Sequence, residues 1–240
     1  MDDRSEKTKK YWDDRAKEHG ESWQATLGEE YLRNLEIRTI IKLIKKYKPS
    51  RVLDVGCGNG YSTKIYAEQF PDIHFVGIDY SEFMIQNANM KPIANCEFYV
   101  GDVLNYDSLP SGSYDLIITQ RCLQNISDYD RQRIAINNLL RKKTIHGTLL
   151  LMECSKDGVD QINRLRIKLG KKVIEGIEPW HNKFFVDDNL INDFGATINH
   201  FTSTYMFLSR VISLKCHLLK LASYLPAVGK FGYDKLYIIT

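Results

Sequence analysis

Residues 52–60, which read VLDVGCGNG, constrain the fold more than any other part of the chain. A short apolar strand pattern runs into three glycines at alternate positions, Gly56, Gly58 and Gly60, and a helix pattern follows directly. Glycines at a turn from strand to helix let the backbone approach a ligand and supply positive φ without steric cost. Their G-x-G-x-G spacing differs from the G-x-G-x-x-G spacing of dinucleotide binders. The segment therefore predicts a ligand-binding turn in an α/β sheet.

An acidic residue, Asp54, lies in the strand pattern just before the glycine turn. A carboxylate there disfavours an anion such as pyrophosphate and favours a ligand that carries an ammonium and a sulfonium group. This order of residues resembles the first motif of the class I S-adenosylmethionine-dependent methyltransferases. The resemblance implies S-adenosyl-L-methionine as the cofactor and methyl transfer as the reaction.

Strand and helix patterns alternate along the chain, which predicts a doubly wound sheet. With the resemblance, the expected fold class is α/β: a Rossmann-like, seven-stranded, mostly parallel sheet with helices on both faces and a helical cap. We expect one domain over residues 1–240, with the cap over residues 1–48 and acceptor-side insertions at 155–186 and 202–233. The second insertion has the pattern of a long apolar helix. The predicted strands cover residues 51–55, 73–79, 96–100, 114–119, 148–154, 196–201 and 235–240.

Composition argues against several classes of function. The net charge is only +3 and the basic residues are spread along the chain, so nucleic acid is not an expected partner. Five cysteines without a C-x-x-C pair predict neither a metal site nor a disulfide framework. The charged N-terminus lacks an apolar leader pattern, which predicts a cytoplasmic location.

The apolar residues 205–228 are interrupted by basic side chains and do not form a good membrane span. A lid or a contact between two copies of the chain is preferred for this segment. A membrane surface that presents a lipid-linked acceptor is the less favoured alternative.

Acidic residues close the first three predicted strands, whose carboxyl ends meet where open α/β sheets bind ligands. After Asp54 come Asp79 and Asp102. The family resemblance implies that Asp79 accepts hydrogen bonds from the ribose hydroxyls and that Asp102 with Val103 holds the adenine. It also implies that Tyr80 packs on the nucleoside, while Asp54 and the first two glycines of the turn face the amino-acid half of the cofactor.

The N-terminal sequence YWDDRAKEHG, residues 11–20, resembles the helix that folds over the cofactor in many small-molecule methyltransferases of this class. Tyr11 and Arg15 lie about one helical turn apart and share a face. Arg15 is therefore a candidate ligand of the methionine carboxylate, and an ordinary surface arginine is the alternative. Trp23 and Thr26 are weaker candidates for the same cleft.

Residues 119–125, which read TQRCLQN after the fourth predicted strand, correspond to the segment beside the transferable methyl group in the class I fold. The Asn/Asp-Pro-Pro-aromatic motif of enzymes that methylate amino groups of DNA bases is absent. Gln120 stands where metal-dependent catechol-type enzymes place an aspartate, so no metal is expected, and Gln120 is counted with the cofactor-binding residues. Arg121 and Gln124 are candidates for contact with the acceptor. The resemblance is thus to small-molecule methyltransferases, including those linked to bacterial glycans and specialised metabolites.

His181, in the sequence EPWHNKFF, is the candidate catalytic base. A hydroxyl acceptor must lose a proton, and the unperturbed histidine pKa of about 6.5 suits that step. Its neighbours Trp180 and Asn182 suit a substrate pocket. A loop histidine that bonds a backbone carbonyl is the alternative.

Three further residues complete the acceptor-side candidates. Asn163 and Arg166 share a helix face, and the arginine suits a phosphate or carboxylate on the acceptor. A solvated helix face is their alternative. Glu153 closes the fifth predicted strand and is placed to orient the base or to bind an acceptor hydroxyl.

The sequence therefore predicts methyl transfer to a small polar metabolite, with a hydroxyl of a sugar, sugar nucleotide or phosphorylated compound preferred. An N-methyltransferase acting on an amine or a protein is one alternative. A non-catalytic module that binds S-adenosylmethionine is another. A homodimer is left open.

Overall fold

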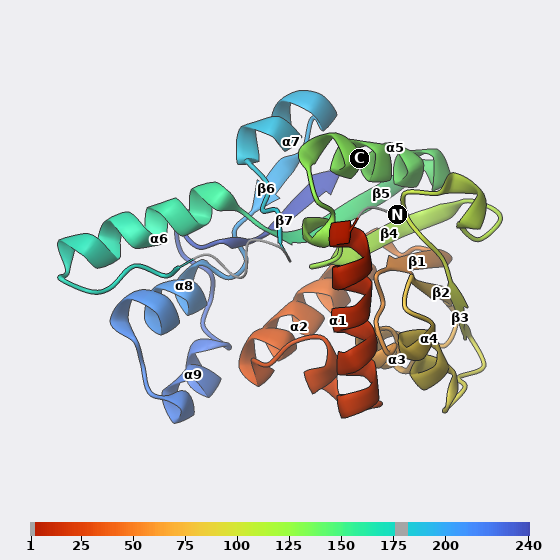
Figure 1. Cartoon of the computed structure of the whole chain (residues 1–240), viewed down its shortest axis with the longest axis horizontal. Helices are drawn as coiled ribbons and strands as arrows, with labels where there is room; N and C mark the ends of the chain where they lie inside the picture. Colours follow the sequence, from red (N-terminus) through yellow and green to blue (C-terminus); the bar gives the residue numbers. More distant parts are fainter. Residues whose placement is uncertain (1–2, 176–181) are drawn as a thin grey trace.

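A computed structural model describes residues 3–175 and 182–240. Within these residues the chain forms a seven-stranded sheet with the order β3-β2-β1-β4-β5-β7-β6 (Figure 1). Strands β1 to β5 are parallel, and β7 is antiparallel to both of its neighbours. The predicted mostly parallel α/β sheet is therefore confirmed. The strands are β1 Arg51–Val55, β2 His74–Asp79, β3 Cys96–Val100, β4 Tyr114–Gln120, β5 Lys143–Cys154, β6 Thr197–Asn199 and β7 Asp234–Ile239.

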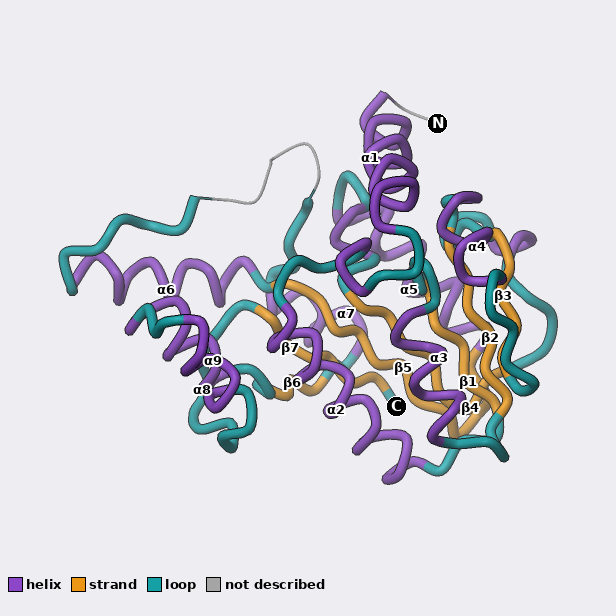
Figure 2. Tube along the Cα trace, turned by 90° about the horizontal axis from the view of Figure 1, so that it is seen from below, coloured by secondary structure: helices purple, strands orange, loops and turns teal. Residues whose placement is uncertain are grey.

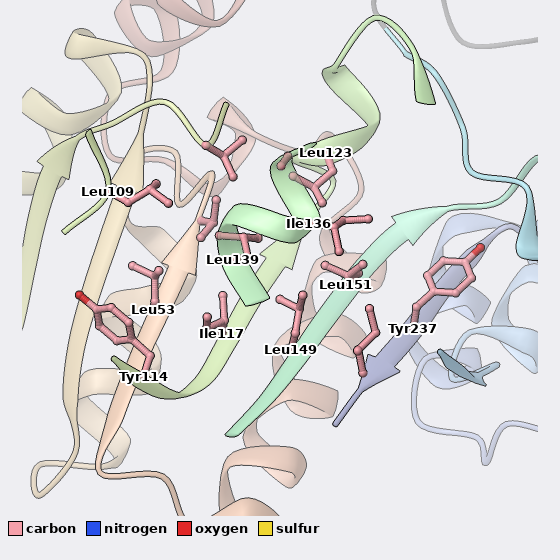
Figure 3. Packing of buried hydrophobic residues seen from close by; sticks show 14 of the residues in the cluster. Leu53, Leu109, Tyr114, Ile117, Leu123, Ile136, Leu139, Leu149, Leu151 and Tyr237 are labelled. Atoms are coloured by element: carbon pink, nitrogen blue, oxygen red, sulfur yellow. The ribbon is translucent and has the colours of Figure 1, made fainter. Parts of the chain in front are cut away.

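Alternating side chains of the strands build two cores, one on each face of the sheet. On one face Leu53, Ile117 and Leu151 pack against α5 (Tyr129–Lys142) and α7 (Asp187–Phe194) (Figure 3). On the other face Val52 and Ile118 pack against three helices. These are α2 Glu30–Tyr47, α3 Tyr61–Gln69 and α4 Glu82–Asn89. Truncation of such a fully buried leucine or isoleucine to alanine costs about 2–5 kcal/mol.

The N-terminal helix α1 (Asp3–His19) lies apart from the two sheet faces and packs against α4 and the 3-10 helix η1 (Trp23–Ala25). Ala16 and Ala25 form a small cluster there with Met84, against which Trp12 packs. The predicted cap of residues 1–48 is thus only partly right. Helix α2 belongs to the sheet core, because Ile37, Ile40 and Ile44 are buried against the strands.

A third group of helices projects from the β5–β7 end of the sheet (Figures 1 and 2). It consists of α6 (Lys156–Lys168), α8 (Ser203–Met206), a π-helical segment (Phe207–Ile212) and α9 (Cys216–Ala222). Ile162 of α6, Met206 and Ala222 share a core with Leu32 of α2 and Cys154 of β5. We call residues 156–175 and 203–233 the lobe.

The structure corrects three details of the predicted elements. The long apolar helix expected in residues 202–233 is broken, because Ser213 adopts a left-handed φ of 65° and a new helix starts at Cys216. Strand β5 begins at Lys143, five residues before the predicted start, and β6 covers only three of the six expected residues. Helix α7 was not foreseen.

Candidate functional site

The glycine turn follows β1 at the point where the strand order reverses, between β1 and β4. Gly56 and Gly58 have φ values of 72° and 56°. A Cβ atom on Gly56 would lie 2.5 Å from Cys122 Sγ, and one on Gly58 would lie 2.5 Å from Thr26 Cγ2. Both positions therefore need glycine for the backbone conformation and for the close approach of neighbouring segments.

Two adjoining hollows lie over the carboxyl ends of the strands and share Gly56, Asp79 and Tyr80 in their walls. We call them together the cleft. The larger hollow has a volume of about 330 Å³, within the range of about 300–1,000 Å³ usual for small-molecule sites. Nine of the ten residues predicted to bind the cofactor line the cleft. They are Tyr11, Arg15, Gly56, Gly58, Asp79, Tyr80 and Gln120 in the larger hollow, and Asp102 and Val103 in the smaller one, which also includes Asp79 and Tyr80.

Asp79 is fixed at the end of β2 by backbone hydrogen bonds. Its Oδ2 accepts from Gly58 N at 3.0 Å and its Oδ1 from Ser81 N at 2.9 Å. Burial raises the pKa of Asp79 to about 6, although these hydrogen bonds act in the opposite direction. Each carboxylate oxygen keeps a further acceptor site for a ligand. The buried hydroxyl of the adjacent Tyr80 has no hydrogen-bond partner among the described residues.

The smaller hollow combines one exposed acid with apolar walls. Asp102 Oδ1 accepts from Leu104 N at 2.9 Å, which holds the carboxylate beside the buried Val103. Leu104 and Ile126 complete the apolar lining. This arrangement suits a flat ring with polar edges.

The tenth predicted residue, Asp54, does not line the two hollows but faces a small chamber behind the glycine turn. It is 2% exposed and accepts a hydrogen bond from Thr63 Oγ1 at 2.6 Å. Burial raises the pKa of Asp54 to about 6. Thr26, Gly56 and Gln120 line both the chamber and the cleft, so the two spaces adjoin.

Arg33 of α2 is a residue of this chamber that the sequence analysis missed. Its guanidinium is buried, donates to Ser62 Oγ at 3.4 Å and to Thr26 Oγ1, and lies 3.9 Å from Glu36. Its Nε has no hydrogen-bond partner among the described residues. Burial, followed by the nearby Arg121, lowers the pKa of Arg33 to about 10. A buried cation with an unused donor is a candidate anion ligand.

Arg15 has a different environment from the one expected. Its Nε donates to Ala25 O at 3.2 Å, and its Nη2 donates to Gln24 O. The guanidinium therefore holds η1 against α1, although the side chain still lines the cleft. Thr26 also lines the cleft, whereas Trp23 is absent from its walls.

Asn59, inside the glycine turn, holds the N-terminal segment over the site. Its Nδ2 donates to Gly20 O at 2.7 Å and to Ser22 O at 2.8 Å. The side chain is 1% exposed. No pattern in the sequence identifies this contact, because both partners are backbone carbonyls almost forty residues away.

The opposite wall of the cleft is the segment that follows β4. Arg121 lines the wall with a left-handed φ of 52°, and its guanidinium forms a buried ion pair with Glu36 of α2. Gln124 Nε2 donates to Asn182 Oδ1 at 3.1 Å, and both side chains line the cleft. Asn125 Oδ1 is buried there without a hydrogen-bond partner among the described residues.

Glu153 does not face an acceptor, which corrects the prediction. Its Oε1 accepts from Thr119 Oγ1, Cys122 N and Leu123 N, and its Oε2 accepts from Gln124 N, at 2.7–3.2 Å. It is fully buried, and burial raises its pKa to about 7. The carboxylate therefore holds the backbone of the segment after β4 in place.

Asn163 and Arg166 were also predicted to reach the acceptor, and this is wrong. Asn163 exchanges two hydrogen bonds with the backbone of Ile174, at 2.7 and 3.0 Å. Arg166 donates to the carbonyls of Lys172 and Arg210. Both side chains fasten the parts of the lobe together. Trp180 and His181 lie outside the described residues.

Among residues 3–175 and 182–240, no group of three or more His, Cys, Asp or Glu side chains could hold a metal ion.

Several known proteins share features of this chain. The family described as "Methyltransferase domain" matches residues 46–183. The trans-aconitate 2-methyltransferase of Deinococcus radiodurans is 32% identical over 99 residues, which are 41% of this chain and 37% of that protein. The malonyl-[acyl-carrier protein] O-methyltransferase of Bacillus anthracis is 30% identical over 114 residues, 47% of this chain and 40% of that protein. The matches thus span well under half the length of these curated relatives.

A solved structure resembles the chain over almost its whole length. The plantazolicin methyltransferase BpumL, in complex with a pentazolic desmethylPZN analog and SAH, superimposes with a TM-score of 0.56 at 18% identity. The alignment covers 98% of both chains. At this identity the likeness shows the fold.

Proposed function

The chain belongs to the methyltransferase domain family, and from that premise we propose that it transfers a methyl group from S-adenosylmethionine to an oxygen atom of a small polar metabolite. The cleft over the glycine turn is the observation that carries this proposal. A hydroxyl of a sugar, sugar nucleotide or phosphorylated compound is the preferred acceptor. A cytoplasmic location and a homodimer remain predictions from the sequence.

The residues of the cleft fit this cofactor. The glycine turn leaves space that a Cβ atom would fill, and Asp79 keeps free acceptor sites for the ribose hydroxyls. The unpartnered Nε of Arg33 suits the methionine carboxylate, and Asp54 in the same chamber suits the ammonium group. Asp102, Val103 and the apolar walls suit the adenine.

When bound, the cofactor supplies a methyl group on a sulfonium sulfur. The neutral thioether that leaves needs no assistance. The protein's contribution is to hold the acceptor atom in line with the methyl–sulfur bond, which lowers the barrier by positioning. Gln124, Asn182 and Arg121 line the wall on which an acceptor would lie. Glu153 keeps that wall rigid through the backbone of residues 122–124.

For a hydroxyl acceptor we propose that His181 removes the proton and that Trp180 lines the pocket beside it. The support is the position of their neighbour Asn182, which lines the cleft. His181→Ala would then lower the turnover rate by about 10²–10⁴-fold and leave cofactor affinity nearly unchanged.

A carboxylate acceptor is the second candidate, favoured by Arg121. Arg121 lines the cleft, and although its Nη1 pairs with Glu36, a guanidinium has further N–H donors that can bind a carboxylate. The relatives of Deinococcus radiodurans and Bacillus anthracis are named as trans-aconitate and malonyl-[acyl-carrier protein] methyltransferases. A carboxylate is already deprotonated at neutral pH, so this reaction requires no base.

Metabolite pools incubated with methyl-labelled S-adenosylmethionine, followed by mass spectrometry, test the proposal. Label that mild alkali releases as methanol identifies a methyl ester and therefore a carboxylate acceptor. Label on oxygen that resists alkali identifies a hydroxyl acceptor, and label on nitrogen would overturn O-methylation. Cofactor binding without labelled product from any pool would instead indicate a non-catalytic module.

A further inference from the structure

Several apolar side chains of the lobe are exposed to solvent and do not pack into its core. Leu221, Tyr224 and Val228 are 64%, 64% and 71% exposed, and Leu218 and Leu225 are 41% and 44% exposed. The inner side of α9 is apolar as well, because Leu219 and Ala222 pack into the core of the lobe. Helix α9 is therefore apolar on both sides, which a surface helix of a water-facing protein is not.

The part of this surface formed by residues 203–233 is basic. Residues 203–233 contain no aspartate or glutamate. Lys215, Lys220 and Lys230 are exposed around α9 and the loop that follows it. Arg210 is the exception among the cations, because it is bound to Glu29 and to the hydroxyl of Tyr233.

Further apolar and basic side chains lie at the end of α6 on the neighbouring part of the lobe, whereas its first two turns carry the exposed acids Asp157 and Asp160. Ile167 and Leu169 are 61% and 53% exposed, beside the exposed cations Lys168 and Lys172. Ile167 lines a shallow groove with Phe231, whose ring packs edge-on against Phe207 at 5.7 Å. Exposed apolar and basic side chains thus occur both on α6 and from α9 to the loop after it. These elements belong to the part of the molecule that projects from the sheet (Figures 1 and 2).

The lobe is fastened to the cofactor domain. Within the lobe, Lys171 Nζ donates to the carbonyl of Ile212 at 3.2 Å, which joins the loop after α6 to the π-helical segment. Arg38 of α2 donates to Ser223 O at 2.5 Å and stacks on the ring of Tyr224 at 4.2 Å. A surface that binds through the lobe would therefore be held at a fixed distance from the cleft.

We propose that the lobe binds the surface of an anionic lipid bilayer. Apolar side chains between lysines match such a surface, because the former enter the acyl boundary and the latter lie at anionic head groups. A second copy of the chain fits less well, since a two-fold contact would set the basic segment 203–233, which has no acids, against itself. Binding to nucleic acid would not explain why the apolar side chains of Leu221 and Val228 are exposed. No helix within the described part of the chain is long and apolar enough to cross a membrane, so the contact is peripheral.

Sedimentation of the full chain with vesicles tests the proposal. We expect binding to vesicles of phosphatidylcholine with phosphatidylglycerol, at least tenfold weaker binding to phosphatidylcholine alone, and weaker binding at high salt. The comparison between the two vesicles and the comparison between salt concentrations both use the unmodified chain. Equal binding to both vesicles, or binding to neither, would overturn the proposal.

Two sets of variants locate the surface. Leu221→Ser with Val228→Ser should weaken vesicle binding by tenfold or more, whereas Met90→Ser with Ile145→Ser, which are 65% and 88% exposed elsewhere, should not. Replacement of Lys215, Lys220 and Lys230 by glutamine should weaken it by about fivefold for each lysine removed. Cofactor affinity should be unchanged in all of them.

Two outcomes would reassign the surface and refute the proposal. One is a dimer in sedimentation velocity that Leu221→Ser with Val228→Ser dissociates, together with no vesicle binding. The other is binding to duplex RNA in preference to anionic vesicles. The proposal does not depend on the identity of the methyl acceptor.

Discussion

Buried charged side chains decide how the cleft works at the scale of single residues. Asp79, Asp54 and Arg33 lie around the glycine turn with few solvent contacts, and burial shifts the pKa of each toward the neutral form. Their remaining hydrogen-bonding capacity is directed at the space that a ligand would fill. Such buried groups destabilise the protein while their hydrogen bonds are unmade, and they favour binding when a ligand supplies the partners.

Asp79 gives a pH-dependent prediction. Its pKa of about 6 means that the carboxyl is largely protonated at pH 5 and ionised at pH 7. Ribose hydroxyls donate to the ionised form, so affinity for S-adenosylhomocysteine should rise between pH 5 and pH 7. Asp79→Asn should lose most of that rise and weaken binding at pH 7 by about 1–3 kcal/mol. Calorimetry across this range measures both effects, and an unchanged affinity in folded Asp79→Asn would refute the assignment.

Arg33 gives a second prediction at this scale. Arg33→Met should weaken S-adenosylhomocysteine binding by about tenfold or more, since a charge-assisted hydrogen bond is lost. Binding of 5′-methylthioadenosine, which has no amino-acid part, should be unchanged and so reports on folding. Arg15→Met should have the smaller effect, because Arg15 already bonds two carbonyls of η1. The reverse order of the two variants would restore Arg15 as the carboxylate ligand.

At the scale of elements, the cleft depends on how two segments are fixed beside the strand ends. The segment after β4 is held by Glu153 of β5, and residues 20–26 are held by Asn59 and Arg15. Neither segment has regular secondary structure beyond a single 3-10 turn. Their positions therefore rest on a few buried hydrogen bonds.

Glu153→Gln should destabilise the protein by about 1–3 kcal/mol at pH 7, because an amide offers one acceptor oxygen where the carboxylate offers two. The wild-type pKa of about 7 lies above the ordinary glutamate value, so the folded state binds this proton more tightly than the unfolded state. The free energy of unfolding should consequently fall as pH rises from about 4.5 to 7. Urea titrations at several pH values should show a smaller fall in Glu153→Gln. Exposed Glu68→Gln serves as the control, and an equal pH dependence in both variants would contradict this role.

Asn59→Ala should release the N-terminal segment from the glycine turn. Two hydrogen bonds to Gly20 O and Ser22 O are lost, each worth about 0.5–1.5 kcal/mol. Hydrogen exchange of α1 and η1 should therefore become faster, and the sheet should be unaffected. The exposed Asn192→Ala is the matched control. Unchanged exchange in α1 would show that packing, for example of Ala16 and Met84, is sufficient to hold the helix.

At the scale of the whole molecule, different strands of the sheet contribute to different walls of the cleft. The ends of β1 to β3 form one wall of the cleft, which we propose binds the cofactor, and the segment after β4 forms the other wall, which we propose faces the acceptor. Thr8, Tyr11, Trp12 and Arg15 of α1 line the cleft. The lobe extends from the β5–β7 end of the sheet (Figure 1). The core of the lobe includes Leu32 of α2 and Cys154 of β5, but the exposed side chains of its outer surface lie outside that core, so changes there should leave the cleft intact.

At the scale of the complete protein, we predict that turnover does not depend on a metal ion. Gln120 occupies the position where a metal-binding aspartate would be expected, so turnover in EDTA should equal turnover without it. Addition of magnesium should cause no increase. A loss of activity in EDTA that magnesium restores would overturn this prediction and favour a catechol-type enzyme.

The sequence by itself determined the features that depend on short-range pattern. Short apolar runs predict the strands and the glycines predict the turn, because each signal lies within a few residues. The acids Asp79 and Asp102, at the ends of two successive strands, line the cleft. The predicted bounds of β1 and β3 agree with the structure residue for residue. Ser81 caps α4 by accepting a hydrogen bond from Met84 N, a contact within three residues of the chain.

Only the tertiary structure decided which polar side chains face the cleft. Glu153, Asn163 and Arg166 looked like ligands, but each is used by backbone groups of other segments. Arg33 looked like part of an ordinary amphipathic helix, and packing of α2 on the sheet buries it behind the glycine turn. Such roles depend on partners brought together from distant parts of the chain, and local periodicity carries no information about those partners.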